Sequence, residues 1–133
     1  MMNLVVMLPT YNERQSIGSL LSALSELEID EVTLSILVID DNSPDGTANY
    51  VESLKLPNVD ILRRPIKDGL GNAYKSGIEK ILQDSRVTHL ISMDADSSHR
   101  IVDLINLIKT AQSNPNADLI IGSRWVPGGG IEN

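Results

Sequence analysis

Hydrophobic residues in this chain fall into two kinds of pattern that alternate along its length. Short, mostly apolar segments occupy residues 4–8, 34–39, 59–62, 87–93 and 118–121. Segments of this length and composition predict strands that are buried on both faces of a sheet. Turn-forming residues, including Asn42-Ser43-Pro44-Asp45-Gly46, follow the second segment and separate it from what comes next.

Between these strands, apolar residues recur at the spacing of an amphipathic helix. The four expected helical faces are Ile17, Leu20, Leu21, Leu24 and Leu27; then Thr47, Tyr50, Val51 and Leu54; then Ala73, Tyr74, Gly77, Ile78, Ile81 and Leu82; and finally Ile101, Leu104, Ile105 and Ile108. Thr10 and Asn12 are candidate caps of the first helix. Strands that alternate with helices predict an α/β fold with a doubly wound, mostly parallel sheet and helices on both faces.

Length and composition limit the possible functions. A chain of 133 residues that is 41% hydrophobic suits a single domain over residues 1–133. The net charge of -7 argues against a nucleic-acid surface, and the basic residues are scattered apart from Arg63, Arg64 and Lys67. The absence of cysteine excludes disulfides and thiolate zinc sites. No apolar run reaches the length of a membrane span.

The fourth strand segment ends at a pair of carboxylates, Asp94 and Asp96, on either side of Ala95. Carboxylates of this kind suit Mg²⁺ or Mn²⁺, which proteins often hold with one or two acidic residues plus the phosphates of a substrate. The alternative is a turn that merely ends the strand, since aspartate is common there. Glu13 and Asp41 follow the first and second strands, so acidic groups should converge on one sheet edge. That convergence favours a cation site for a diphosphate.

Other features of the sequence give weaker indications of function. The segment 69–74 has two glycines of a dinucleotide fingerprint, but Tyr74 replaces the third and the segment follows the third strand, so we reject that interpretation. The chain also has no Gly-Lys-Ser/Thr phosphate loop. His99 could bind a metal or act as a base, although a lone histidine at a helix start is more often a capping or hydrogen-bonding group.

Five stretches resemble a family-two glycosyltransferase of the GT-A fold, a Rossmann-like nucleotide-diphospho-sugar transferase. Within that family, the chain is similar to the polyprenol (dolichol) phosphate mannosyltransferases. The stretches occur in family order and are residues 8–13 (LPTYNE), 38–47 (VIDDNSPDGT), 69–74 (GLGNAY), 93–99 (MDADSSH) and 122–130 (GSRWVPGGG). The second and fourth are specific to the polyprenol-phosphate branch, whereas the first marks only the wider family. Arg100 and Ile101 depart from the His-Pro or Pro-Pro pair that commonly follows the histidine.

The resemblance implies a role for each matching residue. Pro9, Tyr11, Glu13, Ile39 and Asp41 would hold the nucleoside, with Asp41 reading the base. Asp94 and Asp96, with the backbone of Ala95, would hold the diphosphate and a divalent cation, Mg²⁺ or Mn²⁺. Ser98 stands where a third metal ligand is expected, and Arg124 would face the phosphate of the acceptor. Asp94, Asp96 and Arg124 are therefore the expected catalytic residues.

The implied activity is inverting transfer of a sugar, with mannose from GDP-mannose expected, to a polyprenyl or dolichyl phosphate. The alternatives are transfer of glucose or another sugar, elongation of a polysaccharide, and a truncated nucleotide-sugar-binding module without activity. The expected location is the cytoplasmic face of a membrane, and no nucleic acid is expected as a partner. Because the chain stops at Asn133 with only Arg124 to represent the acceptor site, a missing C-terminal segment or a membrane-bound partner is expected to complete that site.

Overall fold

The computed structural model describes residues 1–96 and 100–122. They belong to two compact units, Met1–Ser98 and His99–Asn133. The first unit contains all four strands and three helices, in the order β1 (Met2–Thr10), α1 (Arg14–Ser25), β2 (Val32–Asp40), α2 (Thr47–Ser53), β3 (Val59–Arg63), α3 (Leu70–Ile81) and β4 (His89–Ser92). In the second unit the structure describes one helix, α4 (Ile101–Ser113).

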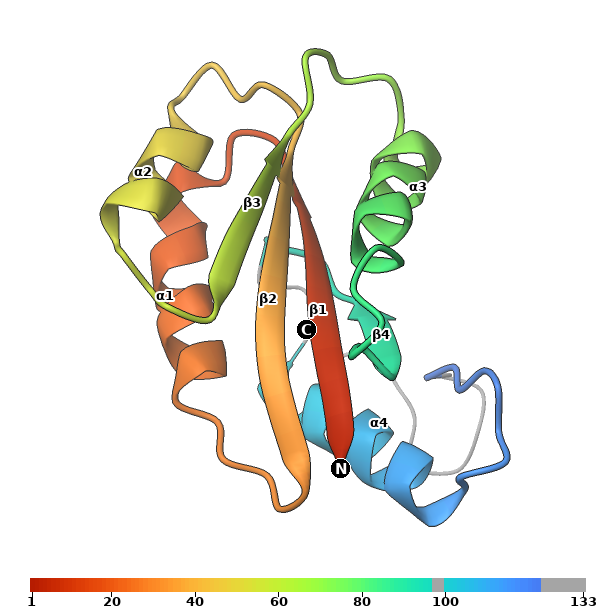
Figure 1. The fold of residues 1–133 in the computed structure, drawn as a ribbon. Helices are drawn as coiled ribbons and strands as arrows, with labels where there is room; N and C mark the ends of the chain where they lie inside the picture. The colour runs from red at the N-terminus through yellow and green to blue at the C-terminus, as the bar shows by residue number, and fades with distance from the viewer. Residues whose placement is uncertain (97–99, 123–133) are drawn as a thin grey trace. The chain divides into compact units, whose positions relative to one another are not determined.

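The four strands form one parallel sheet in the order β3-β2-β1-β4 (Figure 1). This confirms the predicted α/β fold. The ends of three strands are in register, because Thr10 pairs with Asp40 and Asp40 pairs with Arg63. The loops that follow these strands therefore leave the sheet at one edge, where parallel α/β sheets bind ligands.

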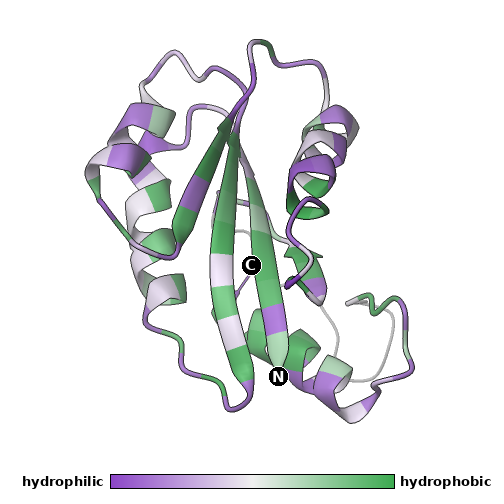
Figure 2. Cartoon of the chain, viewed as in Figure 1, coloured by the Kyte–Doolittle hydropathy of each residue, from purple (hydrophilic) through white to green (hydrophobic). Residues whose placement is uncertain are grey.

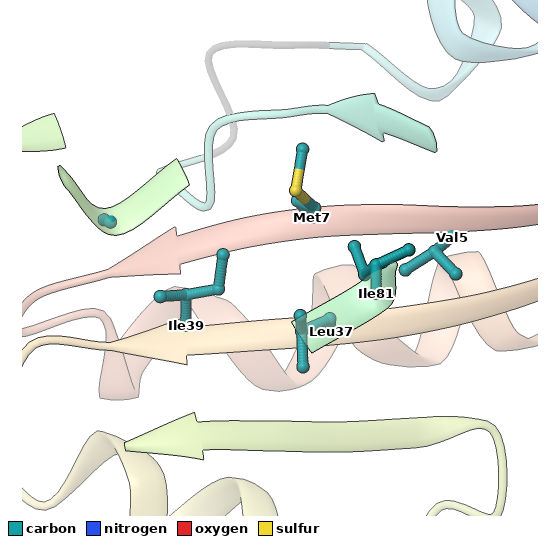
Figure 3. Packing of buried hydrophobic residues seen from close by; sticks show 6 residues of the cluster. Val5, Met7, Leu37, Ile39 and Ile81 are labelled. Atoms are coloured by element: carbon teal, nitrogen blue, oxygen red, sulfur yellow. The ribbon is translucent and has the colours of Figure 1, made fainter. Parts of the chain in front are cut away.

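Helices cover both faces of the sheet in the first unit, with α1 and α2 on one side and α3 on the other (Figure 1). A cluster of buried side chains joins α3 to β1 and β2 (Figure 3) and consists of Val5, Met7, Leu37, Ile39, Ala73 and Ile81. Gly77 brings α3 close to the sheet, since a Cβ atom there would lie 2.4 Å from Cδ1 of Ile39. The absence of a side chain at this position sets the spacing between helix and sheet.

The residues that alternate with this cluster along β1 and β2 point to the opposite face. Val6, Leu8, Ile36 and Val38 are at most 1% exposed. Burial of both faces along most of β1 and the second half of β2 explains why these two central strands are mostly hydrophobic (Figure 2). On the sequence-predicted face of α1, four residues are buried, namely Ile17, Leu20, Leu21 and Leu24.

Some sequence predictions about single elements are wrong. The segment 118–121 is not a strand, and Leu119 and Ile121 are 77% and 74% exposed. An apolar run becomes a strand only where a neighbouring backbone pairs with it, and the described residues give this segment no such pairing. Leu82 follows the last residue of α3 and is 73% exposed, so it does not join the core.

The predicted cap of α1 is also wrong. The N-cap position is Glu13, which makes no capping hydrogen bond with its side chain. Thr10 bonds instead to Asp40 at the end of β2, and Asn12 bonds to Asp45 in the loop that follows it. Among the described residues, no helix is long and apolar enough to cross a membrane.

Candidate functional site

Four loops at the carboxyl edge of the sheet carry the polar residues of the candidate site. They follow β1, β2, β3 and β4, and the first three together with residues 93–96 of the fourth belong to the first compact unit. Hydrogen bonds between these loops hold side chains that are far apart in the sequence.

A buried carboxylate joins the ends of the two central strands. Asp40 is 2% exposed, and its Oδ1 accepts hydrogen bonds from the hydroxyls of Thr10 at 2.7 Å and Ser43 at 2.6 Å. Its Oδ2 accepts from the backbone N–H of Ser43 at 3.0 Å. A buried carboxylate needs such donors to compensate for lost hydration. Asp40 is thus a structural residue that fixes the start of the loop carrying Asp41.

Hydrogen bonds to side chains connect the loop after β1 with the loop after β2 and with the first residue of α2. Thr47 accepts from the backbone N–H of Glu13 at 3.1 Å, and Asn12 accepts from the backbone N–H of Asp45 at 3.2 Å. Burial raises the pKa of Asp45, but hydrogen bonds from Thr47 and from the backbone of Arg14 more than offset this, so the net shift is downward. These contacts place Tyr11 and Glu13 beside the loop that begins at Asp41.

Asp41, the residue expected to read the base, is paired with Arg64 from the loop after β3. Nη1 of Arg64 donates to Oδ1 of Asp41 at 2.8 Å, and Nη2 donates to Oδ1 of Asp68 at 2.6 Å. The bond to Asp68, and then the bond to Asp41, raise the pKa of Arg64. The backbone N–H of Arg64 also donates to the carbonyl oxygen of Asp40 at 2.7 Å. Arg64 therefore fixes the position of the Asp41 carboxylate.

A second basic residue of the same loop lies against Tyr11. The Nζ atom of Lys67 is 4.3 Å from the centroid of the Tyr11 ring, within the range of a cation–π contact. Tyr11 is 37% exposed. The loop after β3 thus reaches the expected nucleoside-binding residues at two points, through Arg64 to Asp41 and through Lys67 to Tyr11.

The loop after β4 is tied to the start of α1. Ala95 is 2% exposed, and its carbonyl oxygen lies 3.2 Å from the hydroxyl of Ser16. The same hydroxyl lies 3.2 Å from Oε2 of Glu13. The backbone N–H of Met93 donates to the carbonyl of Met7 at 3.1 Å, which extends the connection to β1 beyond the end of β4. These contacts bring the Asp94–Asp96 loop next to Glu13.

Tyr74 of α3 lies on the other side of the Asp94–Asp96 loop. Burial raises the pKa of Tyr74, a hydrogen bond with Ser92 lowers it, and the negative charge of Asp94 raises it further. The net shift is upward, so the phenol stays protonated at neutral pH. The Asp94 carboxylate therefore lies close enough to Tyr74 to influence its ionisation.

The donor set of this loop fits a hard divalent cation. Asp94 is half-buried, Asp96 is exposed, and the two carboxylates flank the buried Ala95. No group of three or more His, Asp or Glu side chains suited to a metal occurs within residues 1–96 and 100–122. A site of two carboxylates completed by diphosphate oxygens matches the way Mg²⁺ is usually held, and it needs no third protein ligand.

The structure brings most of the sequence-predicted site residues to one edge. Pro9, Tyr11, Glu13 and Asp41 lie at the ends of β1 and β2, next to the loop that carries Asp94, Ala95 and Asp96. Ile39 differs, because its side chain is fully buried against Gly77 and is not accessible to a ligand. Ser98, His99 and Arg124 lie outside the described residues.

Three residues that contribute to this edge were missed as site residues in the sequence. Arg64 and Lys67 stood out only as the one local concentration of basic residues, and their position after a strand that runs parallel to β2 was the usable signal. Ser16 gave no signal, since a serine in the first turn of a helix is ordinary. Its contact with Ala95 depends on the order of the strands, which the sequence pattern does not specify.

Known proteins resemble this chain in both sequence and structure. The model of glycosyl transferase family 2 matches residues 5–133. The chain is 39% identical over 134 aligned residues to an undecaprenyl-phosphate mannosyltransferase of Micrococcus luteus, covering 99% of this chain and 52% of the relative. It is 38% identical to a polyprenol monophosphomannose synthase of Mycolicibacterium smegmatis, covering 97% of this chain and 48% of the relative. A dolichol-phosphate mannosyltransferase of Pyrococcus furiosus is 35% identical, covering 99% of this chain and 36% of the relative. The chain thus spans about half the length, or less, of these relatives.

Two solved structures share the fold. A mannosyltransferase from Pyrobaculum calidifontis in complex with GDP-Man and Mn²⁺ has a TM-score of 0.62 at 23% identity, covering 81% of this chain and 32% of the other. Glucosyl-3-phosphoglycerate synthase from Mycobacterium tuberculosis, in complex with Mn²⁺, UDP and phosphoglyceric acid, has a TM-score of 0.52 at 19% identity, with coverages of 71% and 33%. Both likenesses confirm the α/β architecture.

Proposed function

Because the chain belongs to glycosyl transferase family 2, we propose that it transfers mannose from GDP-mannose to a polyprenyl phosphate. Three relatives named for mannosyl transfer to polyprenol, dolichol or undecaprenyl phosphate support this choice of sugar and acceptor. The observation that carries the proposal is the junction at Ser16, where Glu13 and the Asp94–Asp96 loop meet at one sheet edge. A nucleoside and a diphosphate can be bound side by side there.

The nucleoside end of the donor binds at Tyr11, Glu13 and Asp41. Every fully buried side-chain nitrogen and oxygen atom of the described residues has a hydrogen-bond partner. Oδ1 of Asp41 accepts from Arg64, whereas Oδ2 accepts no hydrogen bond from the described residues, so Oδ2 retains access to solvent. A carboxylate oxygen that is held in place and still accessible can accept an N–H of a nucleobase.

At the diphosphate end of the donor, Asp94 and Asp96 would hold a divalent cation, Mg²⁺ or Mn²⁺. When bound, the cation neutralises charge on the diphosphate as it leaves. The backbone bond between Met93 and Met7 holds the start of the peptide that carries both carboxylates, and the Ser16 hydroxyl lies 3.2 Å from the carbonyl oxygen of Ala95 within it. Ser98 is a further proposed ligand and lies outside the described residues.

In the reaction, a phosphate oxygen of the acceptor attacks the anomeric carbon of mannose from the face opposite the nucleotide. The bond from that carbon to the diphosphate oxygen breaks, its electron pair stays on GDP, and the configuration inverts. An acceptor phosphate is already ionised near neutral pH, so the chain needs no dedicated general base. Arg124, also outside the described residues, would pair with the acceptor phosphate. Because the proposed acceptor is a lipid, the activity belongs at a membrane surface. We propose the cytoplasmic face of that membrane and a further segment or a partner that completes the acceptor site.

A thermal-shift experiment tests donor recognition. GDP-mannose, UDP-glucose and UDP-N-acetylglucosamine are each added with and without Mn²⁺, since a ligand that binds only the folded state raises the Tm. We expect the largest rise with GDP-mannose and Mn²⁺ together. A larger rise with either UDP-sugar would contradict the proposed donor, and equal rises with and without Mn²⁺ would contradict the proposed cation.

Transfer is tested separately with labelled GDP-mannose and a short, water-soluble prenyl phosphate. A labelled mannosyl phospholipid product with inverted configuration supports the proposal. Donor binding without any product, in the chain both alone and extended beyond Asn133, would instead favour the nucleotide-sugar-binding module that the sequence also allows.

A further inference from the structure

The hydroxyl of Ser16 stands between three oxygen acceptors. Its Oγ lies 3.2 Å from Oε2 of Glu13, 3.2 Å from the carbonyl oxygen of Ala95 and 3.4 Å from the carbonyl oxygen of Glu13. A serine hydroxyl has one hydrogen to donate, so it can satisfy only one of these acceptors at a time. The Glu13 carboxylate and the Ala95 carbonyl therefore compete for one donor.

The two competing acceptors belong to different halves of the proposed donor site. Glu13 belongs to the nucleoside half, and Ala95 lies between the two carboxylates of the cation half. Ala95 is 2% exposed and Met93 is 3% exposed, so this part of the loop has little freedom to seek another donor from water. The direction of the Ser16 hydroxyl thus determines whether the Ala95 carbonyl is held.

We infer that Ser16 is a positioning residue that couples nucleoside binding to cation binding. When a hydroxyl of the nucleoside donates to the Glu13 carboxylate, the Ser16 hydrogen becomes available to Ala95. The Ala95 peptide is then fixed, and with it the directions in which Asp94 and Asp96 leave the backbone. Each ligand thereby favours the conformation that the other needs, which is positive coupling between two sites. This inference rests on the proposed function.

The coupling is measured as a ratio of GDP dissociation constants, taken by calorimetry without Mn²⁺ and with saturating Mn²⁺. Three variants are compared with the wild-type chain: Ser16→Ala, Ser16→Thr and Ser19→Ala. Ser19 is the matched control, because it is exposed on the same helix and its hydroxyl donates to the carbonyl of Ser16 at 3.1 Å. Ser19→Ala makes the same chemical change without touching either acceptor.

We expect Ser16→Ala to reduce the ratio by about fivefold, the effect typical of one lost hydrogen bond, with a smaller change in GDP affinity without Mn²⁺. Ser16→Thr should restore the ratio because it restores the hydroxyl, and Ser19→Ala should match the wild type. Since coupling is reciprocal, the affinity for Mn²⁺ with and without GDP should change by the same factor.

An unchanged ratio in Ser16→Ala overturns the inference, including when the Tm of the variant falls, because that combination shows a structural role only. Equal losses of GDP affinity with and without Mn²⁺ overturn it in the same way. A wild-type chain that binds no GDP under either condition overturns the proposed function itself. The two failures are therefore distinguishable from the wild-type measurement.

Discussion

Asp41 and Arg64 form an ion pair of 2.8 Å in which the side chains are only 9% and 11% exposed. The next residue, Arg63, also makes an ion pair, with Glu52 at 2.6 Å, but those side chains are 49% and 70% exposed. Two adjacent arginines thus offer the same interaction in a shielded and in an open environment. Water screens the exposed pair, so it contributes little to the free energy of unfolding. Loss of one partner from a buried pair instead leaves the other charge buried without compensation, which is destabilising.

Arg64→Ala should therefore lower the Tm and weaken GDP binding, because the Asp41 carboxylate loses the group that holds it. Arg63→Ala is the matched control and should change both by little, since exposed ion pairs contribute about 0 to 1 kcal/mol. Thermal unfolding and calorimetry with GDP measure the two effects. Equal behaviour of the two variants would show that Arg64 does not position Asp41.

Asp41→Asn should weaken GDP binding by about 1.5 to 3 kcal/mol, the usual value of a hydrogen bond to a charged group. The amide keeps the size of the side chain but replaces one acceptor oxygen with a donor. The dissociation constant of GDP reports the change, and the Tm without ligand separates binding from folding. An unchanged dissociation constant would move base recognition to another residue.

Replacing both Asp94 and Asp96 by alanine should abolish the Mn²⁺ dependence of GDP binding and leave the fold intact. Both residues follow the end of β4 rather than lying within the sheet. Circular dichroism checks the fold, and calorimetry with and without Mn²⁺ checks the binding. If the double variant binds GDP with the wild-type Mn²⁺ dependence, the cation is held elsewhere.

The sequence predicted the framework of this molecule because its strongest signals are local. The central strands β1 and β2 are mostly apolar because most of β1 and the second half of β2 are buried on both faces, and the spacing on α1 matches one buried face. The segment 118–121 has the same apolar signal but no pairing among the described residues. A one-dimensional pattern cannot report whether a neighbouring strand is present, which is why this prediction failed.

The candidate site was predictable only in part, for a related reason. Acidic residues directly after strands can be predicted as site residues from the sequence, because parallel strands place them on one edge of the sheet. The residues that hold these acidic groups in place cannot be predicted in this way. Arg64 reaches Asp41 across 23 positions of the sequence, and Ser16 reaches Ala95 across 79. Such contacts follow from strand order and loop path, and neither is encoded in the spacing of residues along the chain.

The pH behaviour of Tyr74 offers a test of its closeness to Asp94. Burial and the nearby carboxylate raise the pKa of Tyr74 above the usual value of 10.0. A raised folded-state pKa means that the associated stability is complete below the unfolded value and is lost as the pH rises through the folded value. Because its pKa is raised, ultraviolet titration should show one tyrosine that ionises at a higher pH than the others. The absorbance change of this tyrosine should be absent in Tyr74→Phe. In Asp94→Asn the absorbance change should move to lower pH. If it stays where it was, the Asp94 charge does not act on Tyr74.

The close approach of α3 to the sheet predicts opposite outcomes for two glycines of one helix. At Gly77, an alanine Cβ would lie 2.4 Å from Cδ1 and 3.3 Å from Cγ1 of Ile39, whose side chain is fully buried. Overpacking of this kind typically costs about 1 to 3 kcal/mol. At Gly71, nothing lies within 4 Å of the added atom, and alanine suits a helix better than glycine does. Denaturant unfolding should thus show Gly77→Ala destabilised and Gly71→Ala unchanged or more stable. Equal stabilities of the two variants would mean that α3 lies farther from β2 than the structure places it.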